Sequence, residues 1–143
     1  MSLAPRLATL VVKNGVSLGL LGAADRALVL ALAAISLAAG RAYREAEVND
    51  KLLIWLDGPG AMLRVDHVEL RRWLVDAGFV ARDGFGRAYV RGAAEAARAD
   101  ALLGPGTSEE LVAEVAGLRA ARAAQREAQR YAHVHADPLA AEL

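Results

Sequence analysis

The stretch DHVELRRWLVDAGFVARDGFGRAYVR, residues 66–91, is typical of a helix followed by a two-stranded ribbon. Asp66 is a favourable helix N-cap, and apolar residues recur after it at helical spacing as far as Ala77. Gly78 then supplies the residue type that most often ends a helix. The remainder is predicted to form a strand, a glycine-rich turn and a second strand, at Phe79–Arg82, Asp83–Gly86 and Arg87–Arg91.

Two further helices are predicted upstream of this stretch. Residues 23–39 contain no glycine or proline and carry leucine and isoleucine at helical spacing, and Gly40 ends the run. Residues 45–56 begin with acidic side chains, which stabilise a helix N-terminus, and a Gly-Pro-Gly loop follows. Three helices followed by a two-stranded ribbon is the order of a winged helix, a variant of the helix-turn-helix. We therefore predict a mainly α winged-helix fold with a small β-ribbon.

An N-terminal hairpin is predicted before the first of these helices. Residues 7–12 are apolar and end in β-branched side chains, and Asn14-Gly15 is the strongest short-range hairpin signal. Apolar residues then alternate with others from Val16 to Leu20. With this hairpin, the predicted winged-helix domain spans residues 1–92.

Residues 93–143 are predicted to form an alanine-rich C-terminal helical extension. It contains a helix over residues 93–103 and a longer helix that begins at the capping residue Thr107 and reaches about His133. The apolar stripe of the longer helix starts with large side chains and continues with alanines, which suit either docking on its own domain or pairing with a second copy. We expect a homodimer, and the candidate dimer residues are Leu111, Val115 and Leu118.

The composition excludes several classes of site. Seventeen basic residues balance seventeen acidic ones, so no global field attracts the chain to nucleic acid or to an anionic membrane. The absence of cysteine excludes disulfides, thiolate metal sites and thiol catalysis. The longest uncharged run, residues 27–40, is too short to span a bilayer, and charged residues interrupt any secretory signal pattern. The expected location is the cytoplasm, with no membrane partner.

No catalytic, cofactor or metal site is predicted. The few serines and threonines lack a nucleophile-elbow pattern, and the chain has no phosphate-binding glycine loop. Glu45 and Glu47 lie two residues apart at a helix start, where their side chains diverge by about 200° and suit capping. His133 and His135, with Asp137, would share a face only in an extended segment. We therefore predict a protein without enzymatic activity.

The region of the second and third predicted helices resembles a prokaryotic family that is known only as a domain of unknown function. The similarity covers about residues 10–91. The matching segments are Tyr43-Arg44-Glu45-Ala46-Glu47-Val48-Asn49, Asp66, Leu70-Arg71-Arg72-Trp73-Leu74-Val75-Asp76-Ala77-Gly78, Arg82, Gly86, Tyr89 and Arg91. The resemblance implies a winged-helix domain that occurs alone or fused to helix-turn-helix transcription regulators, and it implies nucleic-acid binding without an assigned activity.

Two departures from the family pattern carry predictions of their own. Family members have several basic residues just before the first helix, whereas this chain reads LLGAADR over residues 20–26, which predicts weaker phosphate contact. The family joins its second and third helices tightly, whereas the longer connection from Asn49 to Asp66 in this chain predicts a remodelled turn.

In a DNA-binding winged helix, the third helix would enter the major groove and the ribbon would contact phosphates. The candidate DNA-binding residues are His67, Val68, Arg71, Arg72, Arg82, Arg87 and Arg91. A structural alternative exists for Arg71, which can pair with Glu45 or Glu47 and so lock the second helix to the third. Arg72 lies on the face opposite the buried stripe. The sequence allows two interpretations for it, contact with a partner or a structural ion pair.

We therefore expect a DNA-binding transcriptional regulator of winged-helix type, with double-stranded DNA as the partner. The alternative is a protein-interaction winged helix that does not bind DNA, in which the face of Val68, Arg72 and Val75 or the alanine-rich last helix binds a partner. Pairing of the exposed arginines with Glu69, Asp76 and Asp83 would favour this alternative. A third possibility is a ligand-sensing regulator with a pocket between the domain and its extension, which the sequence does not test.

Overall fold

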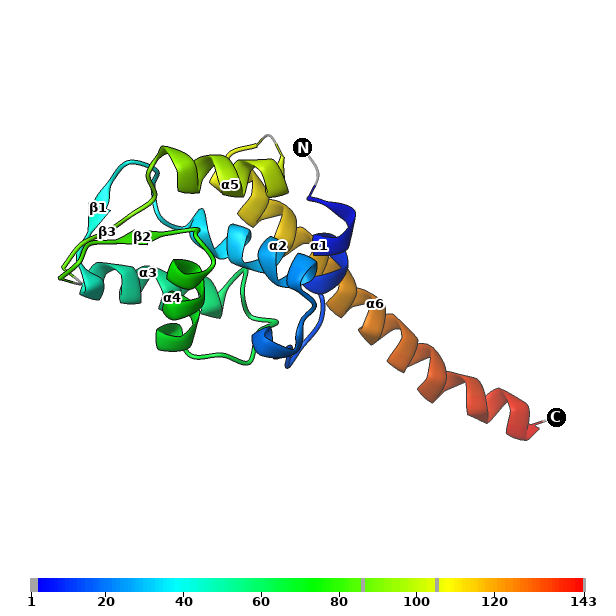
Figure 1. Ribbon diagram of the computed structural model, residues 1–143. Helices are drawn as coiled ribbons and strands as arrows, with labels where there is room; N and C mark the ends of the chain where they lie inside the picture. The colour runs from blue at the N-terminus through cyan, green and yellow to red at the C-terminus, as the bar shows by residue number, and fades with distance from the viewer. Residues whose placement is uncertain (1–2, 86, 105, 143) are drawn as a thin grey trace.

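The computed structural model describes residues 3–85, 87–104 and 106–142, with side chains described as far as residue 135. It is mainly helical with a small antiparallel sheet (Figure 1). The helices are α1 (Pro5–Leu10), α2 (Ala23–Ala34), α3 (Glu45–Asp57), α4 (His67–Asp76), α5 (Ala93–Leu103) and α6 (Ser108–Glu142), with a 3-10 turn at Leu18–Leu20. The strands are β1 (Ala42–Tyr43), β2 (Ala81–Arg82) and β3 (Tyr89–Val90).

The N-terminal segment forms a helix, so the predicted hairpin is wrong. α1 has Pro5 in its first turn, where the missing N–H costs nothing. The buried side chains of this segment are Leu3, Leu7, Leu10 and Val11. Their helical spacing outweighs the local Asn-Gly turn signal. Gly15 does form a turn, with a φ of +65°, but Val16 then bridges to Leu63 instead of pairing with residues 7–12.

The first long helix is shorter than predicted. α2 ends at Ala34, and the chain continues in turns closed by bonds from Ser36 N to Ala33 O and from Leu37 N to Ala34 O. The Ser36 hydroxyl donates to the same Ala33 oxygen at 2.6 Å, a local bond that competes with helix continuation. The segment then reaches β1, a strand of two residues that is too short to show a periodic pattern in the sequence.

The helices on either side of the chain's midpoint follow the sequence prediction closely. α3 ends one residue beyond its predicted end. α4 is capped by Asp66, whose Oδ1 accepts the backbone N–H of Glu69 at 2.8 Å. It ends at Asp76, and Gly78, two residues later, has a φ of +81° that is readily available only to glycine.

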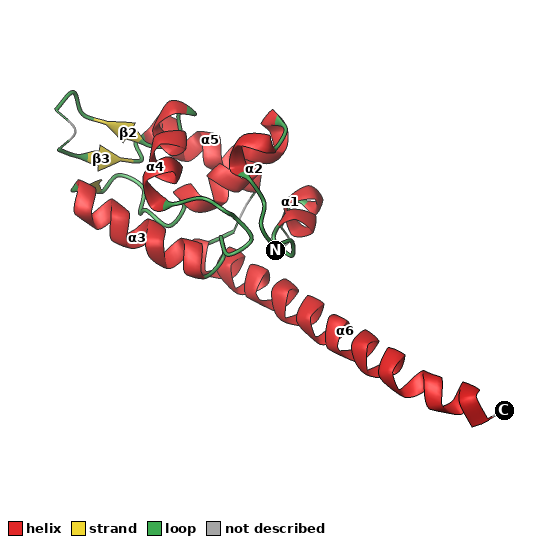
Figure 2. Cartoon of the chain, turned by 90° about the horizontal axis from the view of Figure 1, so that it is seen from below, coloured by secondary structure: helices red, strands yellow, loops and turns green. Residues whose placement is uncertain are grey.

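The sheet joins segments that are far apart in the sequence. Its order is β1-β3-β2, with both neighbouring pairs antiparallel. Tyr89 is the central residue, since it lies opposite Tyr43 on one side and Arg82 on the other. Figure 2 shows β2 and β3 side by side, at the end of the molecule opposite the C-terminus. The predicted ribbon is therefore present, although its strands are shorter than predicted and it gains a third strand.

The long connection between α3 and α4 packs on the side chain of Trp55. A Cβ atom on Gly60 would lie 2.2 Å from the Trp55 ring, so only glycine fits there. The connection is also tied to the N-terminal segment, because Val16 N donates to Met62 O and Arg64 N donates to Val16 O, both at 2.8 Å. The connection is thus held by contacts with the Trp55 side chain and with the N-terminal segment.

One hydrophobic core runs through the domain and the first part of the extension. Ala99 and Leu103 of α5 and Leu111 and Val115 of α6 belong to the same buried cluster as the residues of α1 to α4. The domain boundary that the sequence predicts between residues 92 and 93 therefore passes through the core. Leu111 and Val115 are used within their own chain, and Leu118 is half-buried against the same core, so a dimer surface on α6 has to lie elsewhere.

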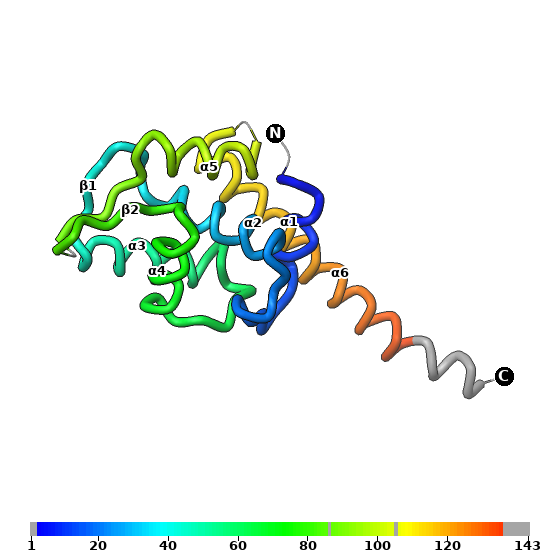
Figure 3. The backbone as a smooth tube through the Cα atoms, viewed as in Figure 1, coloured from blue at the N-terminus to red at the C-terminus, as the bar shows by residue number. Residues whose placement is uncertain are grey.

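The remainder of α6 leaves the body of the molecule. Its start agrees with the predicted cap, since Thr107 Oγ1 accepts the N–H of Glu110 at 3.1 Å. The helix extends to Glu142, beyond the predicted end. The side chains of residues 120–135 are all exposed, and Figure 3 shows this part of the helix running away from the body of the molecule. Within the described ranges, none of the helices combines the length and the apolar character needed to cross a membrane.

Candidate nucleic-acid interface

Arg71 connects α4 to α3 and to the sheet. Its Nη2 lies 3.5 Å from Glu45 Oε1, and its Nη1 donates to Asn49 Oδ1. The Tyr89 hydroxyl donates to the same Glu45 oxygen at 3.0 Å. Burial, together with this bond, raises the pKa of Tyr89 above its ordinary value. Arg71 thus makes the structural pair with Glu45 that the sequence offered as an alternative to DNA contact, and only 15% of its side chain is exposed.

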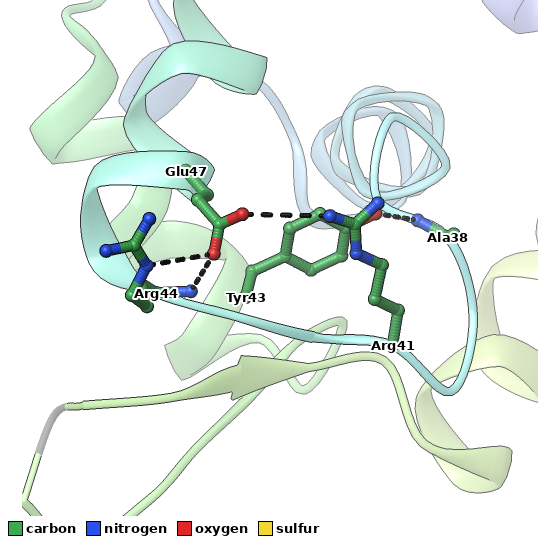
Figure 4. Close-up of polar contacts among 5 residues, drawn as sticks. All are labelled: Ala38, Arg41, Tyr43, Arg44 and Glu47. Carbon is green, nitrogen blue, oxygen red and sulfur yellow. Dashed lines mark hydrogen bonds and ion pairs between the residues drawn. The ribbon is translucent and has the colours of Figure 1, made fainter.

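Glu47, the other carboxylate considered for Arg71, lies in a separate cluster at the start of α3 (Figure 4). Its Oε1 accepts the backbone N–H of Arg44 at 2.9 Å, and its Oε2 lies 3.7 Å from Arg41 Nη2. The bond to the Arg44 backbone is the main cause of a lowered Glu47 pKa. In the same cluster, Ala38 N donates to the Tyr43 hydroxyl at 2.9 Å. These contacts fix the start of α3 against β1.

The candidate residues on α4 differ in their exposure. Arg72 is exposed, whereas His67 and Val68 are half-buried. Glu69 and Asp76 are also exposed on this helix, so its solvent-facing side carries one cation and two carboxylates. The charge on α4 is therefore mixed, and binding to a phosphate backbone has to draw on cations outside this helix.

The ribbon supplies two of the candidate cations. Arg82 and Arg87 are exposed on β2 and just before β3. The turn between the strands is organised by Asp83, whose Oδ1 accepts the N–H groups of Phe85 at 3.2 Å and Arg87 at 2.8 Å. Phe85 at the tip is 81% exposed, and the Arg87 guanidinium lies 5.3 Å from the centre of its ring. The turn is thus shaped to present Phe85 and Arg87 to solvent.

Arg91, a candidate for phosphate contact, is not on this surface. Only 7% of the residue is exposed, and its Nε donates to the carbonyl oxygen of Leu37 at 2.9 Å. The position at the end of β3 places it under α2 and α5, whose packing the local sequence does not reveal. The prediction that Arg91 belongs to an exposed positive face is therefore wrong, and the exposed candidates that remain are Arg72, Arg82 and Arg87.

Sequence reasoning missed a pair of arginines that stack on aromatic rings. Arg26 lies 4.6 Å from the centre of the Trp73 ring, and Arg98 lies 4.7 Å from that of Phe79. Both line a pocket of about 290 Å³ that also includes Asp76. The contacts join α2 to α4 and α5 to the segment after α4. No local pattern could have revealed them, because each pair is separated by many residues.

The structure also addresses the histidine motif near the C-terminus. His133 and His135 lie on α6, where residues two apart diverge by about 200°, so the extended arrangement that would bring them together does not form. The Asp137 side chain lies outside the described residues. In the part of the chain that is described, no three side chains of the metal-binding types are grouped as a metal site requires.

No curated protein matches this chain, and no solved structure does either. A family model matches the segment that begins just before α2 and ends just after β3. This segment contains Arg71 with its partners Glu45, Asn49 and Tyr89 (the Arg71 cluster) and the ribbon. It also contains Glu47 with Arg41 and Arg44 (the Glu47 cluster). Residues 22–91 are thus similar to DUF2087, a family described as an uncharacterized protein conserved in bacteria.

Proposed function

We propose that residues 23–91 form a winged-helix domain that binds double-stranded DNA in the bacterial cytoplasm and regulates transcription without catalysis. The observation that carries the proposal is the arrangement of the elements. The order α2-β1-α3-α4-β2-β3, with a sheet in which β3 lies between β1 and β2, is that of winged-helix domains. This step from fold to function rests on analogy, and the exposed arginines give it its chemistry.

In this proposal α4 enters the major groove. Arg72 extends from its solvent-facing side, and the guanidinium group can contact a base edge or a phosphate. Arg82 and Arg87 on the ribbon contact the adjacent backbone. Arg71 contributes indirectly, because its bonds to Glu45 and Asn49 hold α4 against α3. The exposed carboxylates of α4 reduce non-specific attraction, so we expect weak, strongly salt-dependent binding to random DNA.

The test is a fluorescence-anisotropy titration of a labelled random-sequence duplex at low salt and near physiological salt. The wild-type chain should bind with a dissociation constant of about 10⁻⁴ to 10⁻⁶ M, and log K should fall linearly with log salt. Arg72→Ala and Arg82→Ala should each weaken binding, and loss of one phosphate contact should make the salt slope shallower by about 1.

Lys13→Ala is the control for this titration. It removes one positive charge from an exposed residue just after α1, which lies far from the ribbon (Figure 1), and it should leave the affinity unchanged. The proposal fails if the wild-type chain shows no binding at low salt, or if Lys13→Ala weakens binding as much as Arg72→Ala does.

A protein-interaction role without DNA binding is the second candidate, and one observation favours it. Leu53 and Ile54 are 49% and 71% exposed on α3, an unusual position for two adjacent large apolar residues. Under this alternative, the anisotropy titration shows no binding even at low salt. Replacing Leu53 and Ile54 by serine would then leave the stability of the isolated chain nearly unchanged, because both side chains already face water.

We also propose that two copies associate through the exposed half of α6. A helix without tertiary contacts is marginally stable in water at this length, so a partner would stabilise residues 120–135. The first turns of α6 carry Glu109 and Glu110, whereas the exposed half carries Arg122, Arg126, Arg130 and one carboxylate, Glu127. When the exposed half of each α6 runs antiparallel along the first turns of the other, in a pair centred near residue 120, Arg130 of one copy lies beside Glu110 of the second copy. A dimer of this kind would present two copies of α4 to two DNA half-sites.

A further inference from the structure

Arg91 has a hydrogen-bonding group that the chain does not satisfy. Its Nε is bonded to Leu37 O, but its Nη1 is buried and has no partner among the described residues. None of the ion pairs among those residues includes Arg91. Burial lowers the pKa of Arg91, which reflects the cost of holding the cation away from water. The N–H groups of a buried guanidinium normally all have acceptors, and among the described residues the Nη1 group of Arg91 has none.

Arg91 lines a pocket of about 180 Å³ where the domain meets the extension. The walls come from the turn after α2, the C-terminal end of α5 and the N-terminal end of α6. Three leucines and an isoleucine supply the apolar lining, and Asp100 and Ser108 supply polar groups. The apolar residues are Ile35, Leu37, Leu103 and Leu111. The pocket thus combines a cation, a carboxylate and an apolar wall in a space suited to a small molecule.

The N-terminus of α6 lies at this pocket and adds positive potential to it. The first N–H groups of a helix have no partner within it, and the partial charge of the helix dipole is concentrated there. Thr107 satisfies the N–H groups of Glu110 and Leu111, through its hydroxyl and its carbonyl oxygen. The N–H groups of Ser108 and Glu109 precede these, and among the described residues neither has an acceptor. Ser108 itself lines the pocket.

Two glycines that precede α6 contribute backbone to the pocket. Gly104 and Gly106 both line the pocket and have φ values of +79° and +144°. Side chains are rarely tolerated in this region of φ, so the backbone approaches the pocket without a Cβ atom on either residue. The unpaired guanidinium and the helix N-terminus are therefore two independent features that point to an anionic group.

We propose that this pocket binds a free α-amino acid with a small aliphatic side chain. The carboxylate would accept hydrogen bonds from Arg91 and from the α6 N-terminus. Asp100 would accept the ammonium group, and the leucines would contact the side chain. A simple inorganic anion fits less well, because the Asp100 carboxylate would repel it. Nη1 is covered by its neighbours, so binding includes a slight rotation of the guanidinium towards the carboxylate.

The proposed site connects the end of β3 to the start of α6. Arg91 directly follows β3, which is the central strand of the sheet, and Ser108 is the first residue of α6. A ligand held by both would fix α6 relative to the ribbon. The proposal concerns binding alone, so it stands whether or not the chain binds DNA.

The test is isothermal titration calorimetry of the full chain with L-alanine and L-valine, and with acetate and ethylammonium as single-charge probes. We expect saturable binding of one or both amino acids, and binding of acetate and ethylammonium at least about tenfold weaker, since each lacks one of the two charged contacts. Asp100→Asn should reduce amino-acid affinity at least about tenfold while keeping the shape of the side chain.

Asp50→Asn on the exposed face of α3 is the matched control, and it should bind as the wild-type chain does. Arg91→Lys keeps the charge but loses the planar donor arrangement, so it should fold and should bind less tightly. Two outcomes overturn the proposal. Acetate binding as tightly as alanine would show a site for anions alone, and no heat of binding with any probe would show that the Arg91 charge is purely structural.

Discussion

Arg71 and Arg72 are neighbours in the sequence, and the structure gives them opposite environments. About 100° of helix rotation separates them, so Arg71 reaches Glu45 and Asn49 while Arg72 faces solvent. The helical wheel of α4 alone predicts this difference, because both exposures depend only on the position of the buried stripe.

The burial of Arg91 could not be predicted in the same way. Its environment is set by Leu37 and by the pocket that α5 and α6 complete, and these segments are remote in the sequence. In the sequence, Arg91 lies at the end of the ribbon and is followed by a glycine, a pattern that predicts an exposed wing residue. Its burial results instead from the packing of the extension on α2, which no local pattern encodes.

Tyr89 gives a pH-dependent prediction for the Arg71 cluster. Its hydroxyl is buried and bonded to Glu45, so its pKa is higher in the folded chain than in the unfolded one. The stabilising contribution of the protonated phenol is complete below about pH 10, the ordinary tyrosine pKa, and is lost as the pH rises through the higher folded value. Urea unfolding of the wild-type chain and Tyr89→Phe between about pH 8 and pH 11.5 measures this loss.

The variant should be less stable at the lower pH, by about 0.5–1.5 kcal/mol for the lost hydrogen bond. The difference between the two proteins should shrink above about pH 10, because the variant has no phenol to ionise at this position. Two stability curves that stay parallel across the whole range would contradict the role given to Tyr89.

At the scale of elements, the capping of α4 can be tested separately from its packing. The Asp66 carboxylate accepts the N–H of Glu69 and has no other role in the described contacts. Asp66→Ala should therefore lower the free energy of unfolding by about 0.5–2 kcal/mol. Asp66→Asn keeps a side-chain oxygen and should cost much less. Urea unfolding of both variants checks this, and equal losses would show that the charge matters more than the cap.

The helices with clear boundaries in the sequence were the easiest elements to predict. α3, α4 and α5 have acidic first turns, capping residues or glycine stops, and the structure agrees closely with their predicted ranges. The N-terminal hairpin and β1 were not predicted correctly, for two reasons. A single Asn-Gly signal was given more weight than the helical spacing of the leucines in α1. β1 forms because β3 is available to pair with it, and that information is non-local.

The whole molecule is organised around one core that includes the first part of the extension. Leu111 and Val115 hold the start of α6 in this core, while its second half extends into solvent. The apolar stripe in the sequence of α6 predicted a helix with a buried face. It left open whether that face packs on the same chain or on a second copy. The structure assigns the large side chains to the same chain and leaves the alanine- and arginine-rich half exposed.

The proposed dimer makes the final prediction, because its stability depends on charges that the folded body does not use. Reversing Arg122, Arg126 and Arg130 to glutamate should weaken the antiparallel α6 pair by at least about tenfold in Kd, since each exposed ion pair contributes about 0.2–1 kcal/mol and the reversal adds repulsion. Sedimentation equilibrium at micromolar concentration and low salt measures this. The matched triple lysine variant keeps the charge and should stay dimeric, and adding Glu109→Arg and Glu110→Arg to the reversed variant should restore the pair. A wild-type chain that remains monomeric at low salt, or a reversed variant that dimerises as well as the wild type, would overturn the proposed pairing of α6.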